Sequence, residues 1–170
     1  MTKRKILIPL DRTNYSLKIL PEIEKLIAPS ETEIVLLHVA KSADKVGVTV
    51  PTYEADMPVN HHPDYTMANQ WPHMAYAGKD EATIQQRLEE QLRSKSLPLK
   101  QAGYQVSTLV AFGDPAKEIM KAISDEHIDL IAMTTHARAG LKKLFVGSVT
   151  EEILHHTAVP MLVLHPTEAE

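Results

Sequence analysis

Residues that could bind a phosphate group are concentrated between Thr134 and Ser148. The loop in this stretch carries one histidine and three cationic side chains, which are His136, Arg138, Lys142 and Lys143. Gly147 and Ser148 follow the loop and open a predicted helix. The start of a helix presents unpaired backbone N–H groups and the positive end of the helix dipole, and both favour a bound phosphate. The stretch therefore indicates a phosphate site.

A second interpretation of the same helix start needs no ligand. Ser148 is followed three residues later by Glu151, which is the spacing of a capping box. In that motif the serine side chain itself satisfies a backbone N–H group of the first turn. Cationic residues in a loop are also commonly exposed to solvent without a bound anion. The residues of this stretch alone leave both interpretations open.

Two other kinds of site use residue types that this chain contains. Asp11, His136 and Ser148 could supply a hydrolase triad, but no G-x-S-x-G motif exposes the serine. The best candidate cluster for a metal ion is His61, His62, Asp64 and His73. Adjacent histidines point in different directions in most backbones, and this cluster has no pair at i, i+4 spacing. We therefore expect no catalytic residues and no metal site.

The length, charge and composition of the chain exclude several classes of protein. The chain has 170 residues, which predicts one domain, residues 1–170. A net charge of −4 argues against nucleic-acid binding, and the lack of cysteine excludes disulfides and thiol chemistry. The first residues, MTKRKILIPLD, contain too short an apolar run for a signal peptide or a membrane span. We expect a cytoplasmic protein that binds no membrane.

Five short runs are typical of strands: Lys5–Leu10, Glu33–Val39, Gln105–Ala111, Leu130–Met133 and Met161–Leu164. The first, second and fourth are typical of buried parallel strands, whereas Gln105–Ala111 alternates at first and is expected nearer an edge of the sheet. Predicted helices separate them: Tyr15–Ile27, Asp80 to about Gly103, Asp114–His127 and Ser148–His156. Pro21 indicates a kink or a restart in the first helix. The apolar stripe expected on the second helix is Ile84, Leu88, Leu92, Leu97 and Leu99.

This alternation of strands and helices predicts an α/β fold with a doubly wound open sheet. Its five strands should be mostly parallel, with helices on both faces. Sheets of this kind bind ligands at the carboxyl ends of the strands, where the winding reverses. Asp11 and Thr134 both stand at such strand ends, so they are expected to lie beside the predicted phosphate site.

Residues 41–79 interrupt the alternation with a long stretch that has no helical or strand periodicity. It contains the only tryptophan, Trp71, together with Tyr53, Tyr65 and Tyr76. A loop of this length in a compact domain is commonly functional or disordered. We interpret it as a flap that packs on the domain or on a partner, and we expect it to become ordered when nucleotide or a partner binds.

The chain resembles the universal stress protein family. The resemblance rests on KILIPLD, EIVLLHV, FGDPAKEIMKAISDEHIDLIAM and THARAGLKKLFVGSVTEEILHHTAVPMLVL, which cover both ends of the chain. It implies a Rossmann-like sheet in the order 3-2-1-4-5 and a homodimer that pairs the last strands, here Pro160 to His165. Many members bind ATP through a motif of glycine, two residues, glycine, nine residues, and glycine with serine or threonine.

Aligned on this chain, the motif falls on Thr134, Ala137 and the pair Gly147-Ser148, so two of its glycines are replaced. An alanine in place of a glycine that needs a positive φ would lower the stability of the fold by about 1 kcal/mol or more. By resemblance, Pro9, Leu10, Val39 and Met133 line an adenine pocket, and Asp11 reaches the ribose or an adjacent magnesium ion. The remaining residues of the implied nucleotide site are Thr134, His136, Ala137, Arg138, Gly147, Ser148 and Val149.

Three functions follow as hypotheses. The first is a stress-response protein that binds an adenine nucleotide (ATP, ADP or AMP) and acts by regulation or interaction, not by turnover. The second is a family member that has lost nucleotide binding and serves as a dimeric interaction module with unknown protein partners. The third is a slow ATP hydrolase, for which the sequence offers no general base beyond Asp11 or His136.

Overall fold

The computed structural model describes residues 3–40, 81–135 and 147–166. The strands are β1 (Arg4–Pro9), β2 (Thr32–Ala40), β3 (Gln105–Phe112), β4 (Leu130–Thr134) and β5 (Met161–Leu164). The α-helices are α1 (Ile19–Leu26), α2 (Glu81–Gln101), α3 (Pro115–Asp125) and α4 (Ser148–His156). Two short 3-10 helices, η1 (Ser16–Lys18) and η2 (Pro29–Glu31), flank α1.

The sheet is parallel throughout the described residues, in the order β3-β2-β1-β4-β5. Strand β1 is at its centre and pairs with β2 on one side and β4 on the other. Leu7, for example, is in register with Val35 of β2 and with Ile131 of β4. The predicted strand order and the edge position of β3 are confirmed.

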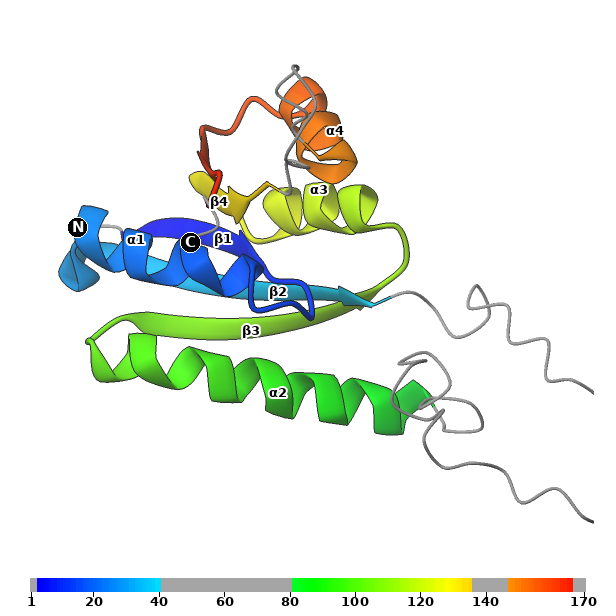
Figure 1. Cartoon of the computed structure of the whole chain (residues 1–170), viewed down its shortest axis with the longest axis horizontal. Helices are drawn as coiled ribbons and strands as arrows, with labels where there is room; N and C mark the ends of the chain where they lie inside the picture. Colours follow the sequence, from blue (N-terminus) through cyan, green and yellow to red (C-terminus); the bar gives the residue numbers. More distant parts are fainter. Residues whose placement is uncertain (1–2, 41–80, 136–146, 167–170) are drawn as a thin grey trace, which may run out of the picture.

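Helices cover both faces of this sheet (Figure 1). One apolar core lies between the sheet and helices α1 and α2, and it contains Ile8, Ile23 and Leu92. The other lies between the sheet and helices α3 and α4, and it contains Leu7 and Ile153. Since successive side chains of a strand point to opposite faces, consecutive residues of β1 enter different cores. The runs predicted as buried strands are β1, β2 and β4, and these are buried on both faces, whereas the edge strands β3 and β5 are only partly buried.

Helix α2 differs from its prediction at Leu97. That side chain is 51% exposed, so its assignment to the apolar stripe is wrong. Ser96, which has no exposed surface, takes the inward position between Leu92 and Leu99. The spacings of four and three residues keep Ser96 on the helix face that covers the sheet, whereas Leu97 is rotated away from it.

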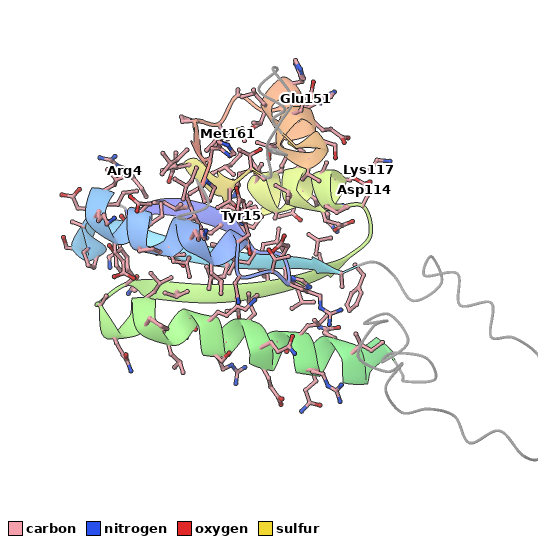
Figure 2. All side chains as sticks on the ribbon, viewed as in Figure 1. Arg4, Tyr15, Asp114, Lys117, Glu151 and Met161 are labelled. Carbon is pink, nitrogen blue, oxygen red and sulfur yellow. The ribbon has the colours of Figure 1, made fainter. Side chains whose placement is uncertain are left out.

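The predicted start of α3 at Asp114 is confirmed, and the first predicted helix restarts as expected. Asp114 caps α3 by accepting a hydrogen bond from the backbone N–H of Lys117 at 3.1 Å, with Pro115 in the first turn. The side chains of Asp114 and Lys117 lie near each other at the start of this helix (Figure 2). The predicted helix at Tyr15–Ile27 divides into η1 and α1, and Pro21 falls in the first turn of α1. A proline there removes no intrahelical hydrogen bond, so the predicted restart is observed.

The stretch 41–80 lies outside the described residues, and so do its aromatic residues and the His61 cluster. The interpretation of residues 41–79 as a flap therefore stays a prediction. Within the ranges 3–40, 81–135 and 147–166, no helix is long and apolar enough to cross a membrane.

Candidate functional site

The carboxyl end of β1 is held against β2 by two hydrogen bonds. The backbone N–H of Leu10 donates to the carbonyl oxygen of Leu37 at 2.8 Å, and Nδ1 of His38 lies 2.8 Å from the carbonyl oxygen of Leu10. A carbonyl oxygen only accepts hydrogen bonds, so Nδ1 of His38 carries the proton and donates it. The chain thus remains attached to β2 for one residue beyond the end of β1.

Asp11 follows directly and begins a tight turn. Its Oδ1 accepts hydrogen bonds from the backbone N–H of Thr13 at 2.8 Å and from Oγ1 of Thr13 at 2.6 Å. Its backbone N–H donates to Oγ of Ser16 at 3.2 Å. These bonds fix the half-buried carboxylate at the carboxyl edge of the sheet, which is the position that the sequence predicts for it.

The end of β4 and the start of α4 are joined by Thr135. Its backbone N–H donates to the carbonyl oxygen of Leu164 at 2.9 Å, and its Oγ1 accepts a hydrogen bond from the N–H of Gly147 at 3.0 Å. Thr134, just before it, is buried and ends β4 in an extended backbone, as predicted. Thr135 therefore brings together the two ends of the loop that contains His136, Ala137 and Arg138. Those three residues lie outside the described ranges.

The start of α4 contradicts the capping box. The N-cap residue is Gly147, not Ser148, and no side chain of the described residues caps the helix. Ser148 is the first helical residue and is exposed, and the N–H of Glu151 bonds only to the carbonyl oxygen of Gly147 among the described contacts. Thr135, which lies outside the helix, accepts the hydrogen bond from the N–H of Gly147. This contact fixes the position of the first turn of α4. The unpaired N–H groups of the first turn remain available to an anion.

The predicted site residues lie on both faces of the sheet. Val39, Met133 and Val149 pack against the core between the sheet and helices α3 and α4, and Pro9 of β1 shares a face with Leu7 of that core. Leu10 belongs instead to the core under α1 and α2, where it is 3% exposed. Any contact of Leu10 with a ligand beside α4 would therefore involve its backbone.

Sequence reasoning missed two residues that shape this edge of the sheet, His38 and Thr135. His38 is 7% exposed and lies within an apolar strand, where a buried histidine signals a specific hydrogen-bond partner. Thr135 adjoins the buried strand β4 and is itself 6% exposed, although it is polar. Each bonds a backbone group far away along the chain, which the sequence does not identify.

Burial lowers the pKa of His38 below the usual value for histidine. The hydrogen bond to Leu10 and the charge of Asp11 raise this pKa, while Lys95 and Arg12 lower it further. The net effect is a neutral ring at neutral pH, with Nδ1 protonated and Nε2 as an acceptor.

No group of three histidine, aspartate or glutamate side chains that could hold a metal ion occurs within the part of the chain that the structure describes.

The chain matches a known sequence family and individual members of it. A family model described as the universal stress protein family matches residues 3–165. The universal stress protein MJ0577 of Methanocaldococcus jannaschii is 32% identical over 88 residues, which are 49% of this chain and 54% of that protein. The universal stress protein YxiE of Bacillus subtilis is 25% identical over 160 residues, which are 94% of this chain and 97% of that protein. The match with MJ0577 thus spans about half of that protein, and the match with YxiE spans nearly all of YxiE.

Solved structures share the fold. The structure of MJ0577 superimposes with a TM-score of 0.64 at 22% identity, covering 99% of this chain and 100% of that chain. A universal stress protein in complex with cAMP gives a TM-score of 0.54 at 12% identity, covering 97% and 98%. A universal stress protein family protein of Arabidopsis thaliana with AMP bound gives 0.57 at 14% identity, covering 97% and 93%.

Replacing Thr135 with valine should lower the free energy of unfolding by about 1 kcal/mol, because the N–H of Gly147 loses its acceptor. Replacing Ser148 with alanine should change it by less than about 0.5 kcal/mol, because Ser148 makes no capping hydrogen bond. Urea unfolding followed by circular dichroism measures both. If Ser148→Ala lowered the free energy of unfolding as much as Thr135→Val does, the result would support the capping box instead.

The lowered pKa of His38 predicts a pH dependence of stability. The unfolded chain binds the His38 proton more readily than the folded chain, so stability should fall as the pH drops below the usual pKa of histidine. His38→Asn, which keeps a donor near the position of Nδ1, should remove this part of the pH dependence. His155→Asn, which replaces an exposed histidine in the last turn of α4, is the matched control. Equal changes in the two variants, measured by urea unfolding across a pH series, would contradict the assignment.

Proposed function

Because the chain belongs to the universal stress protein family, we propose that it is a stress-response protein that binds an adenine nucleotide and acts by regulation or interaction. The observation that carries this proposal is the start of α4, where none of the side chains that the structure describes forms a cap. Thr135 attaches this helix start to the end of β4. The phosphate of the nucleotide would accept the N–H groups of Ser148 and Val149.

The adenine ring and the ribose would lie along the carboxyl ends of β1, β2 and β4. Pro9, Val39 and Met133 offer apolar surface on the face that α4 covers. Asp11 would accept a hydrogen bond from a ribose hydroxyl, because its turn holds the carboxylate at this edge. This combination of an apolar wall and a few polar groups is typical of small-molecule sites.

Two relatives with the same fold support the choice of ligand. One solved universal stress protein is in complex with cAMP, and that of Arabidopsis thaliana has AMP bound. Both ligands carry an adenine and a single phosphate group. For this chain we therefore propose AMP and cAMP as candidates beside ADP and ATP.

A second candidate function is a dimeric interaction module without nucleotide. It is favoured by Thr134 and Ala137, which stand where the ATP-binding motif of the family has glycine. Either function is compatible with a homodimer joined through Pro160 to His165. In support of that dimer, β5 forms one edge of the sheet among the described strands, and Val163 is 38% exposed there. Exposed edge strands readily pair with another chain.

Replacing Asp11 with asparagine should weaken nucleotide binding by about tenfold, because a charged acceptor becomes a neutral one. Asparagine keeps an oxygen for the turn with Thr13, so the fold should be retained. Titration calorimetry with AMP, ADP and ATP measures the loss. Asp129→Asn is the control, since it removes the same charge at the opposite end of the sheet, where Asp129 accepts from the N–H of Lys5. Equal losses in both variants would argue against a role for Asp11 at the ligand.

Replacing Val163 with proline should convert a homodimer to monomers or insoluble protein, because proline removes a backbone donor at the sheet edge. Val163→Thr, which keeps the branched side chain, should leave the dimer intact. Light scattering of the two purified variants and of the wild type distinguishes these outcomes. A monomeric wild type, or a dimer that Val163→Pro does not affect, would rule out this interface.

A further inference from the structure

A pocket of about 280 Å³ lies beside α2, on the face of the sheet opposite α4. It lies between the segment that follows β1, the end of β2 and helix α2, and its lining residues are Arg12, Asn14, His38, Leu88, Gln91, Leu92, Ser94 and Lys95. Leu88 and Leu92 are 4% and 2% exposed and form its apolar floor. His38 points to this side because it shares the face of Leu36, which belongs to the core under α2.

The described residues that line this pocket are cationic or neutral. Arg12 and Lys95 supply two positive charges, Asn14 and Gln91 supply amide groups, and none of the lining residues is acidic. Asp11 is the neighbouring carboxylate, and its Oδ1 is bonded to Thr13. A small pocket with this lining should attract an anion that has several acceptor oxygens.

Lys95 is held at the pocket by the chain itself. Its Nζ donates to the carbonyl oxygen of Asp11 at 3.4 Å, which is a long hydrogen bond. An ammonium group has three donors, so this contact orients Lys95 and leaves it able to bind an anion as well. The half-buried side chain loses less freedom on binding than a fully exposed lysine would.

His38 lies close enough to the charged groups around this pocket to be affected by them. Besides burial, which is the largest effect, Lys95 and Arg12 lower its pKa, while the hydrogen bond to Leu10 and the charge of Asp11 raise it. With Nδ1 bonded to Leu10, the neutral ring keeps Nε2 as an acceptor. The pocket thus combines two cations with an acceptor that can pair with a hydroxyl group of a ligand.

We propose that this pocket binds a small phosphate ester, at a site separate from that of the adenine nucleotide. Arg12 and Lys95 match the charge of a phosphate group, which is about −1.5 to −2 at neutral pH. His38 would accept a hydrogen bond from a hydroxyl group of the ester. The volume of about 280 Å³ is at the lower limit for small-molecule sites, so the ligand has fewer atoms than a nucleotide.

This inference does not depend on the proposed nucleotide function. The nucleotide would lie on the face that α4 covers, whereas the pocket opens beside α2 on the other face. The two sites share only the segment around Asp11, through its carboxylate in one case and its carbonyl oxygen in the other. Either site can therefore be absent while the other binds its ligand.

The test is a titration of the full-length protein with glycerol 3-phosphate, followed by NMR of the His38 ring at constant ionic strength. In the wild type the His38 resonances should shift saturably. Lys95→Gln should weaken the apparent affinity by about tenfold, because one charge-assisted contact is lost. Lys100→Gln removes the same charge from the same helix at an exposed position outside the pocket, and should leave the affinity unchanged. Circular dichroism verifies that both variants are folded.

Four outcomes would overturn the proposal. The first is that no saturable shift of His38 occurs at millimolar concentration. The second is equal weakening by Lys95→Gln and Lys100→Gln, which would indicate general charge attraction. The third is that succinate, tested as a dicarboxylate of similar charge, binds as tightly as the phosphate ester. The fourth is displacement of glycerol 3-phosphate by AMP, which would make the pocket part of a nucleotide site.

Discussion

Strand β1 is paired on both sides and buried on both faces, and the rest of the fold depends on this. Leu7 and Ile8 have no exposed surface, and each faces a different core. A strand in this position requires helices on both faces of the sheet, and parallel pairing requires right-handed crossovers to place them. The chain leaves β1 toward α1 on one face and leaves β4 toward α4 on the other face, so it diverges at the carboxyl ends of β1 and β4. In open sheets of this kind, such a divergence is where ligands bind, and Asp11 and Thr135 stand at these two strand ends.

Side chain to backbone hydrogen bonds then give this edge its geometry. His38 holds Leu10 beside β2, and Thr135 holds Gly147 beside β4. The two faces of the edge differ in chemistry, because alternate residues point in opposite directions. The face toward α4 combines apolar side chains with an uncapped helix start, which suits an adenine nucleotide. The face toward α2 combines Arg12, Lys95 and His38, which suits a smaller phosphate.

Most of the fold could be predicted because its determinants are local. Apolar runs indicated the strands, and the third predicted helix began at Asp114, which caps α3 in the structure. Leu97 was assigned wrongly because the buried Ser96 interrupts the apolar pattern that periodicity relies on. The capping box was wrong because a threonine outside the helix binds Gly147, and no sequence motif encodes that contact. The pocket beside α2 escaped prediction for a related reason: Arg12 and Lys95 are 83 residues apart in the chain and meet only after the sheet has formed.

The central claim is that this chain binds an adenine nucleotide beside the start of α4. Its most direct test is mass spectrometry of the small molecules that denaturation releases from the purified protein, followed by calorimetric titration of the ligand-free protein. The account predicts a retained adenine nucleotide, or saturable heat with AMP, cAMP, ADP or ATP. Absence of any released nucleotide, together with no heat of binding for all four at millimolar concentration, would contradict it and leave the chain as an interaction module.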